Sequence, residues 1–189
     1  MSVVTVLTGQ DIARSLARIA HEIIERNRSV ENCIVIGMHT RGVPLAQRLS
    51  NLLDTFSETV VQTGTLDISA YRDDVTEKEL PDGTNRTSIP LNIENKTVIL
   101  VDDVLYTGRS IRAAMDALID RGRPASIQLV ALVDRGHREL PIKADYVGKN
   151  IPSARHESVK VRLKEVDGTD EVVIIKTPLK RNKPEIDKE

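Results

Sequence analysis

Two adjacent carboxylates followed by a short polar turn form the most chemically distinctive stretch of the sequence. Asp102 and Asp103 come directly after the apolar run 98–101, at the expected solvent-facing end of a strand, and residues 105–110 read Leu-Tyr-Thr-Gly-Arg-Ser. Amides and hydroxyls at a helix start can converge on an anion, which the helix dipole also favours. The carboxylates can accept hydrogen bonds from vicinal sugar hydroxyls. The pattern therefore predicts a site for a ligand with both a phosphate and a free ribose diol.

The competing interpretation of this stretch is an ordinary strand-to-helix connection with acidic residues at the sheet edge. Either acid alone, or Thr-Gly-X-Ser alone, carries little information, but the combination directly after a buried strand favours the ligand site. The sequence contains neither the Gly-Lys-Ser/Thr of a Walker loop nor a Gly-X-Gly-X-X-Gly that follows a strand. These two nucleotide-binding motifs are therefore excluded.

A second loop, residues 37–42, reads Gly-Met-His-Thr-Arg-Gly and also follows a buried apolar run. A threonine hydroxyl, an arginine and exposed amides between two glycines suit a second anion. Taken alone, this pattern is more typical of a plain surface loop. Paired with the downstream motif, it favours a second binding site. We expect His39 to contact an anion or solvent rather than to act as a catalytic base.

Buried strands and amphipathic helices alternate along the chain and place both loops at strand ends. We expect helices over 9–28, from Pro44 onward and over 110–120, strands over 32–37, 96–104 and 126–134, a strand or hairpin over 60–71, and short strands over 159–163 and 172–175. Thr8 is the expected N-cap of the first helix, with Asp11 as the capping-box acid. Residues 72–90 are charged and lack periodicity, as in a functional loop. The alternation predicts parallel βαβ units in one α/β domain.

The composition fits a globular protein and excludes several classes. Of 189 residues, 40% are hydrophobic and 29% are charged, and the net charge of −1 indicates neither a nucleic-acid nor a membrane partner. Aromatic residues make up only 2%, which argues against a base-stacking platform of the RRM or OB type. The single cysteine, Cys33, is expected in the core. Without a signal peptide or an apolar run near ~20 residues, we expect a cytoplasmic protein.

The stretch 98–110 resembles the phosphoribosyl pyrophosphate motif of type I phosphoribosyltransferases, and loop 37–42 is similar to the pyrophosphate loop of that family. The resemblance implies an α/β fold with a central, mostly parallel sheet, flanking helices and a small hood lobe. Residues 1–178 would form this single domain, and 179–189 a charged, disordered tail. It also implies that Mg²⁺ is the cofactor, held by Asp102 and Asp103 mainly through water, with the same acids holding the ribose hydroxyls.

The family's functional residues carry over to matching positions. The implied contacts to phosphoribosyl pyrophosphate are Thr40, Arg41, Gly42, Asp102, Asp103, Leu105, Tyr106, Thr107, Gly108, Arg109 and Ser110. The implied catalytic residues are Asp102, Asp103, Arg41 and Arg72. Arg72 would face the pyrophosphate when a flexible loop closes over the site.

Residues 132–152 and 16–22 resemble a narrower family, the regulators of pyrimidine-operon attenuation, and the similarity runs from the first helix to Pro152. It implies binding of the pyrimidine-operon mRNA leader under control of UMP or UTP. It also implies conversion of uracil and phosphoribosyl pyrophosphate to UMP and pyrophosphate, in a homodimer or larger homo-oligomer. The implied uracil contacts are Val133, Asp134, Arg135 and Arg138. The alternatives are a purely metabolic phosphoribosyltransferase without RNA binding and a nucleotide sensor without catalysis.

Because the chain is nearly neutral, an RNA surface must be a local basic patch. The candidates come from two distant segments: Arg18, His21, Arg26, His137, Arg138, Lys143 and Lys149. The competing interpretation is that Arg18 and His21 merely solvate a helix face beside Glu22 and Glu25. For the helix alone this interpretation is preferred, and only the family resemblance favours RNA binding.

Overall fold

The centre of the protein is a parallel sheet of five strands, in the order β3-β2-β4-β5-β6. The strands are β2 (Cys33–Met38), β3 (Gln62–Leu66), β4 (Thr97–Leu105), β5 (Ser126–Asp134) and β6 (Tyr146–Asn150). The computed structural model describes residues 2–71, 86–90 and 92–176. β2 and the first part of β4 are buried on both faces, which explains their continuous apolar runs.

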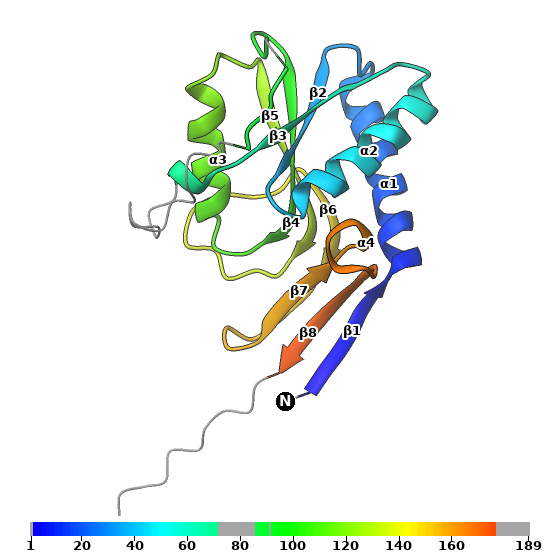
Figure 1. Ribbon diagram of the computed structural model, residues 1–189, viewed down its shortest axis with the longest axis vertical. Coiled ribbons are helices and arrows are strands. Elements are labelled where there is room, and N and C mark those ends of the chain that lie inside the picture. Colours follow the sequence, from blue (N-terminus) through cyan, green and yellow to red (C-terminus); the bar gives the residue numbers. More distant parts are fainter. Residues whose placement is uncertain (1, 72–85, 91, 177–189) are drawn as a thin grey trace, which may run out of the picture.

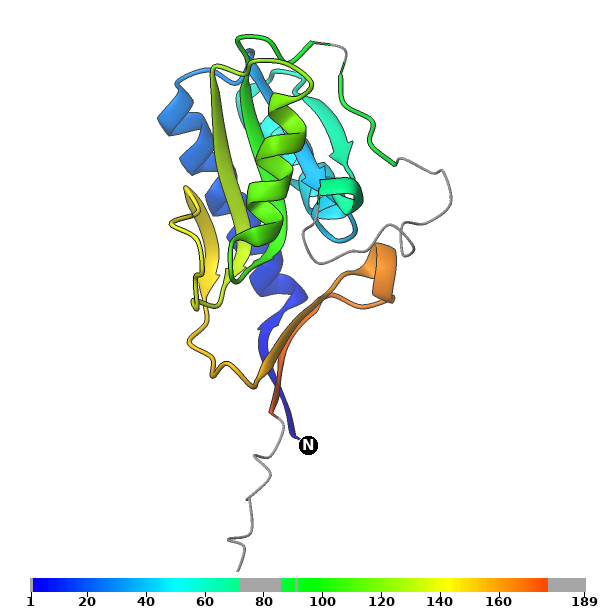
Figure 2. The same cartoon turned by 90° about the vertical axis from the view of Figure 1, so that its left-hand side faces the viewer.

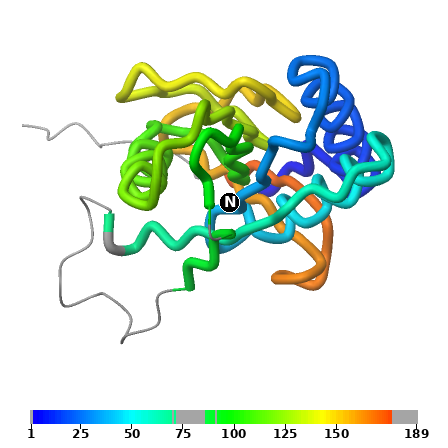
Figure 3. Tube along the Cα trace, turned by 90° about the horizontal axis from the view of Figure 1, so that it is seen from above, coloured from blue at the N-terminus to red at the C-terminus, as the bar shows by residue number. Residues whose placement is uncertain are grey.

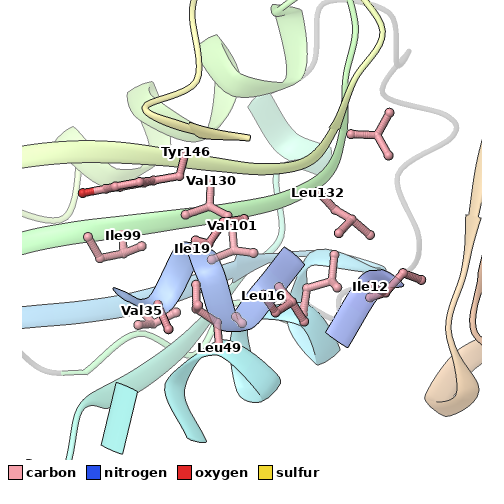
Figure 4. Close-up of a cluster of buried hydrophobic side chains, with 14 of the residues drawn as sticks. Ile12, Leu16, Ile19, Val35, Leu49, Ile99, Val101, Val130, Leu132 and Tyr146 are labelled. Carbon is pink, nitrogen blue, oxygen red and sulfur yellow. The ribbon is translucent and has the colours of Figure 1, made fainter. Parts of the chain in front are cut away.

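Helices cover both faces of this sheet. α1 (Gly9–Asn27) and α2 (Gly42–Ser57) pack on one face, and α3 (Arg109–Ile119) packs on the other (Figures 1 and 2). Seen end-on, the sheet runs between these two layers (Figure 3). Figure 4 shows the core on the α1 and α2 side, where Leu16, Ile19 and Leu49 meet Val35 and Val101. The sheet is therefore a rigid base for the loops at its edge.

A second, antiparallel sheet forms a hood beside the first. Its strands are β1 (Ser2–Thr8), β7 (Ser158–Arg162) and β8 (Glu171–Lys176), in the order β1-β8-β7. The one-turn helix α4 (Lys164–Asp167) joins β7 to β8, and a 3₁₀ turn η1 (Ser69–Tyr71) follows β3. The amino-terminal strand and the carboxy-terminal hairpin thus combine, although they are far apart in sequence (Figure 1).

Most expected elements are present, within a residue or two of their expected bounds. Thr8 caps α1, and its side chain and that of Asp11 exchange hydrogen bonds with each other's backbone amides in a capping box. Cys33 is buried, as expected. The hairpin alternative for 60–71 is wrong, because β3 pairs with β2 in parallel. None of the described helices combines the length and the apolar character that a membrane span requires.

Three elements escaped the sequence analysis: β1, β6 and α4. β1 lies at the edge of the hood sheet and is mostly exposed although four of its seven residues are apolar, so its apolar residues do not mark a buried face. β6 is an edge strand of five residues with one fully buried side chain, Tyr146. α4 is a single turn with no buried residue. The tail 179–189 and most of the loop 72–90, including Arg72, lie outside the described residues.

Candidate active site

Both loops singled out by the sequence lie at the carboxyl ends of neighbouring parallel strands. β2 and β4 pair with Gly37 opposite Val101, and β4 and β5 pair with Leu105 opposite Asp134. The chain therefore leaves β2, β4 and β5 at the same edge of the sheet. This is the edge at which open α/β sheets bind ligands. Fold topology thus brings loop 37–42, the two aspartates and the segment after Asp134 together.

Asp102 and Asp103 lie inside β4, because the strand continues to Leu105, and both are half-buried. This corrects the expectation of acids at a solvent-facing strand end. Each carboxylate accepts one backbone hydrogen bond of 2.9 Å, from the amide of the following residue. Burial and the charge of Asp103 raise the pKa of Asp102 well above its usual range. Burial also raises the pKa of Asp103, although the Val104 amide and Arg41 oppose the shift. Such a pair favours a ligand that brings hydroxyl donors or a cation.

The turn after β4 lines a cavity of about 530 Å³. Its lining residues are Asp102, Val104, Leu105, Tyr106, Thr107, Gly108, Arg109, Ser110, Ile111 and Glu139. Gly108 has a φ of 92° and immediately precedes α3, so the chain turns sharply there without the penalty that a side chain would carry. The amides of the first turn of α3 are thus presented at the cavity. The expected phosphate cradle, residues 105–110, is therefore one continuous surface.

Glu139 is a residue of this cavity that the sequence analysis missed. Its carboxylate accepts a hydrogen bond of 2.7 Å from Nε of Arg109, and its amide donates to the carbonyl of Thr107 at 2.9 Å. The charge of Arg109 is thereby partly balanced on the surface of the cradle. Glu139 is distant in sequence and only tertiary structure brings it here.

The loop after β2 lies against β4 and lines a second cavity, of about 380 Å³. A Cβ on Gly42 would meet the Val101 carbonyl oxygen at 2.4 Å, so only glycine allows this close approach. Met38, His39, Thr40, Asp67, Ile68, Ser69, Arg86, Asp102, Asp103, Val104 and Ser110 line the cavity. The peptide bond between His39 and Thr40 is cis. His39 Nε2 lies 3.2 Å from the carbonyl oxygen of Arg86, and among the described residues no carboxylate is hydrogen-bonded to its ring.

Asp67 is a second acid that the sequence analysis left without a role. It belongs to the same cavity as Thr40 and Asp103. Burial opposes ionisation of Asp67, but hydrogen bonds from the hydroxyl and amide of Ser69, at 2.6 and 3.0 Å, outweigh it and lower its pKa. Asp67 is therefore an ionised group in the lining of the second cavity.

A third cavity, of about 310 Å³, lies between the loop after β2 and the hood. Arg41, Asp103, Val159, Lys160, Val161, Arg162 and Asp167 line it. Each aspartate of β4 is shared by two cavities: Asp102 by the first and second, and Asp103 by the second and third. The site is thus a row consisting of an amide-rich cradle, two carboxylates and an arginine-bearing loop. That order matches the phosphate, the diol and the pyrophosphate of a phosphoribosyl pyrophosphate.

Comparisons with known proteins agree with this geometry. The family model described as "Phosphoribosyl transferase domain" matches residues 2–165. The bifunctional protein PyrR of Deinococcus radiodurans is 59% identical over 166 residues, which are 88% of this chain and 91% of that protein. The bifunctional protein PyrR of Clostridioides difficile is 56% identical over 163 residues, 86% of this chain and 92% of that protein. The chain belongs to the PyrR family of phosphoribosyltransferases.

Solved structures show the same fold as this PyrR-family chain. A hypoxanthine phosphoribosyltransferase of Trypanosoma cruzi aligns with a TM-score of 0.71 at 22% identity, covering 91% of this chain and 94% of that one. A hypoxanthine phosphoribosyltransferase of Staphylococcus aureus aligns with a TM-score of 0.66 at 22% identity, covering 93% of each chain. The type I phosphoribosyltransferase fold expected from the sequence is confirmed.

The side chains of the residues expected near uracil make most of their contacts within the protein. The Val133 side chain is fully buried in the core. Arg135 is 8% exposed, donates to Ser153 Oγ and to the carbonyls of Ala154 and Glu157, and lies over the Tyr106 ring at 4.3 Å. The side chains of Val133 and Arg135 are therefore engaged within the protein, and the expected contact of uracil with backbone groups around residues 133–138 stays a prediction.

Arg138 also has a structural role in this PyrR-family chain, because it joins the segment after β5 to the turn after β4. Its guanidinium pairs with Asp134 and donates to the carbonyls of Tyr106 at 2.8 Å and Ile142 at 2.9 Å. These bonds fasten the segment after β5 to the start of the phosphate cradle. Arg138 was expected to bind both uracil and RNA, and its position beside the cradle agrees with the first of these better than the second.

The structure divides the expected RNA patch into separate groups. Arg18 donates to the carbonyls of Val147 and Gly148, at 2.8 and 2.9 Å, next to the exposed Lys149. Arg26 pairs with Asp145 at 2.6 Å on the same side of α1. His21 turns toward α2 instead, where its ring stacks on Phe56 at 4.2 Å. The remaining candidates follow β5: Lys143 is exposed, and the His137 ring lies near Ser153 and Tyr106. Of these candidates, Arg18, Arg26 and Lys149 lie together on α1 and β6, where Arg18 pairs with Glu22 and Arg26 with Asp145.

The two carboxylates of β4 suit partial ligation of Mg²⁺ but do not enclose an ion by themselves. Among the described residues, no cluster of three or more His, Cys, Asp or Glu side chains could enclose a metal ion. Two adjacent carboxylates with raised pKa values are nevertheless present. Mg²⁺ usually keeps several waters and takes one or two carboxylates together with substrate phosphates. Asp102 and Asp103 suit this partial ligation and do not form a dedicated metal site.

Replacing both aspartates by asparagine should separate stability from function. The double variant Asp102→Asn with Asp103→Asn replaces two negatively charged hydrogen-bond acceptors by neutral amides. The affinity for phosphoribosyl pyrophosphate, measured by calorimetry with Mg²⁺, should therefore fall about 100-fold or more. The same double variant removes a repulsive pair, so the melting temperature at pH 7.5 should rise by about 2–4 °C for each kcal/mol gained.

The pH dependence provides the control. A carboxylate whose folded-state pKa is raised destabilises the protein at pH values above that pKa, and this cost disappears as the pH falls toward about 4, where the unfolded chain also takes up protons. The difference in melting temperature between variant and wild type should therefore shrink between pH 7.5 and pH 4. An unchanged affinity for the ligand at pH 7.5 would remove the two aspartates from the ribose site.

Proposed function

We propose that the row formed by the cradle, the two carboxylates and the arginine loop holds phosphoribosyl pyrophosphate, so that uracil attacks C1 of the ribose. The protein is a uracil phosphoribosyltransferase that also regulates pyrimidine-operon expression by binding mRNA. The observation that supports the residue assignment is the sharing of Asp102 and Asp103 between consecutive cavities. A ligand that spans them must place its diol at the carboxylates when its two phosphate-bearing ends occupy the cavities on either side.

In the proposed reaction the bond between C1 and the pyrophosphate oxygen breaks, while a bond forms between N1 of uracil and C1. The N1 proton is released and the electron pair of the broken bond leaves with pyrophosphate. No covalent intermediate with the protein is needed, so catalysis rests on positioning and on stabilising charge. Residues 105–110 anchor the 5′-phosphate, and Asp102 and Asp103 fix the ribose. Thr40, Arg41 and Gly42 form the loop that receives the pyrophosphate.

Mg²⁺ would be held by Asp102 and Asp103 mainly through water and would balance the pyrophosphate charge. The guanidinium of Arg41 adds a permanent positive charge at the same end of the site. Its pKa is raised because it donates to Asp167, so it stays protonated throughout the physiological range. Arg72, which was expected to assist it, lies outside the described residues.

Uracil would lie beside the segment after β5. Arg135 and Arg138 fix the conformation of this segment by donating hydrogen bonds to the backbone carbonyls of Ala154, Glu157 and Tyr106. Among residues 133–138, backbone groups that make no hydrogen bond within the protein would read the polar edge of the base. Asp134 is already engaged by Arg138 and by the amide of Gly136 at 2.9 Å, which fixes the turn rather than the base.

For RNA, we propose the basic group of α1 and β6, with Arg18, Arg26 and Lys149 at its centre. It lies on the outer side of the sheet edge strand, away from the cradle, so nucleotide and RNA can be bound together. A purely metabolic enzyme is not favoured, since the relatives carry the name bifunctional. A homo-oligomer and a cytoplasmic location stay predictions.

The enzymatic proposal is tested by incubating the protein with radiolabelled uracil, phosphoribosyl pyrophosphate and Mg²⁺. Labelled UMP should form, and unlabelled pyrophosphate should slow its formation by occupying the arginine end of the site. Omission of Mg²⁺ should reduce the rate strongly. Faster turnover of hypoxanthine or another base than of uracil would contradict the assignment of substrate.

The RNA proposal is tested by changing Arg18 and Lys149 together to Gln. Binding of a pyrimidine-operon leader should weaken. If a single-stranded loop is bound, the slope of the logarithm of the binding constant against the logarithm of the salt concentration should flatten by about 0.7 for each phosphate that is no longer neutralised. UMP should tighten RNA binding by the wild type, because a regulator must favour its RNA-competent state when product is abundant.

A variant with Arg112→Gln and Arg123→Gln removes the same charge from the α3 side of the sheet and serves as the control. Both double variants should retain uracil phosphoribosyltransferase activity. An equal loss of RNA affinity in the two, or no change in salt slope, would show that the α1 and β6 group is only a solvated face.

A further inference from the structure

One turn of the hood is fastened to the start of α2 by two arginines and three acids. Arg41, at the N-cap of α2, donates through Nε and Nη2 to the two carboxylate oxygens of Asp167, at 3.1 and 2.7 Å. Two turns further along α2, Arg48 donates to both oxygens of Glu165, at 2.8 and 2.6 Å, and to Asp170 at 2.7 Å. We call these five residues the hood clamp. It joins the pyrophosphate loop directly to α4 and the turn that follows it.

The acids of the hood clamp are themselves fixed by the backbone. Asp167 Oδ2 accepts from the Leu163 amide at 2.9 Å, and Asp170 Oδ1 accepts from the Lys164 amide at 2.9 Å. Only 19% of the Asp167 side chain is exposed, against 34% of Arg41. Bidentate arginine–carboxylate pairs hold the plane of the guanidinium as well as its position. The orientation of Arg41 is thus set by the hood, not by its own loop.

This orientation leaves one edge of Arg41 for a ligand. Among the described residues, no hydrogen-bond partner of Arg41 Nη1 is present, since Asp167 uses only Nε and Nη2. Arg41 lines the hood cavity together with Asp103 and Lys160. Lys160 extends from β7, next to the hood clamp, and makes no ion pair within the part of the chain that the structure describes. Two cationic groups therefore border the cavity that adjoins the second carboxylate of the ribose site.

We propose that Asp167 is a positioning residue for the reaction: it holds Arg41 so that Nη1 faces the pyrophosphate, and Arg48 with Glu165 and Asp170 keeps Asp167 in place. The inference rests on the proposed function, in which Arg41 contacts pyrophosphate. It adds that α4 is a working part of the active site rather than a connection between two strands. An arginine fixed before the substrate arrives loses less side-chain freedom on binding.

If Asp167 instead competed with the substrate for Arg41, the effect of Asp167→Asn on substrate affinity would have the opposite sign. A carboxylate that competed with pyrophosphate for Arg41 would weaken substrate binding, and its removal would tighten it. The geometry favours positioning, because Asp167 takes the Nε side of the guanidinium and leaves the Nη1 edge open to the cavity.

The test is the kinetics of Asp167→Asn in the full-length protein. The KM for phosphoribosyl pyrophosphate should rise about 10-fold, which is the size of effect expected when a charged hydrogen-bonding group is misplaced. The KM for uracil should stay nearly constant, because Asp167 lies at the pyrophosphate end. Asp167→Glu restores the carboxylate and should recover part of the affinity. The affinity of the free protein for inorganic pyrophosphate, measured by calorimetry, should fall in parallel in Asp167→Asn.

Asp116→Asn is the matched control, since Asp116 accepts from Arg112 at 3.3 Å on the exposed side of α3, away from the site. It should leave both KM values unchanged. Unchanged or tighter binding of pyrophosphate by Asp167→Asn would overturn the proposal, and so would equal increases in both KM values. Failure of the proposed function is distinguishable: the wild type would then form no UMP and bind no phosphoribosyl pyrophosphate at all.

Discussion

The burial of two neighbouring carboxylates inside β4 is the constraint around which the site is built. Asp102 and Asp103 are placed by a strand that is buried along most of its length, so they cannot move apart or turn to solvent without disturbing the sheet. Burial raises the pKa of both acids, and the charge of Asp103 adds to the shift of Asp102. In the proposed complex, a ribose diol and its associated cation would offset this cost of burial, which would then contribute to the selection of a phosphoribosyl compound.

The surrounding elements act as supports for this pair. Gly42, at the start of α2, lets the loop after β2 approach Val101 of β4, and Gly108, with its positive φ, lets the chain turn between β4 and α3. The segment after β5 is fastened to the cradle by Arg138. The hood clamp fastens the arginine loop to the small sheet. The Arg41 guanidinium and the start of the cradle are thus fixed by residues outside their own loops.

The sequence was informative where function depends on local order. The stretch Asp102–Ser110 and the loop 37–42 were recognised because the acids, hydroxyls and glycines that define them are adjacent in the chain. Glu139 and Asp167 were missed, since each reaches the site by tertiary contacts with Arg109 and Arg41 that no spacing reveals. For the same reason the sequence did not show that the Arg135 guanidinium is engaged within the protein, by oxygen atoms of residues 18 to 22 positions away along the chain.

The order of ligand groups along the row of cavities is the central claim, and a crystal structure of the protein with phosphoribosyl pyrophosphate and Mg²⁺ tests it most directly. The account predicts the 5′-phosphate among the amides of residues 105–110 and both ribose hydroxyls within about 3 Å of the carboxylates of Asp102 and Asp103, or of water on Mg²⁺. The pyrophosphate should lie against Arg41. A ligand bound in the reverse direction, with its pyrophosphate in the cradle, or a ribose that does not approach the two aspartates, would contradict the account.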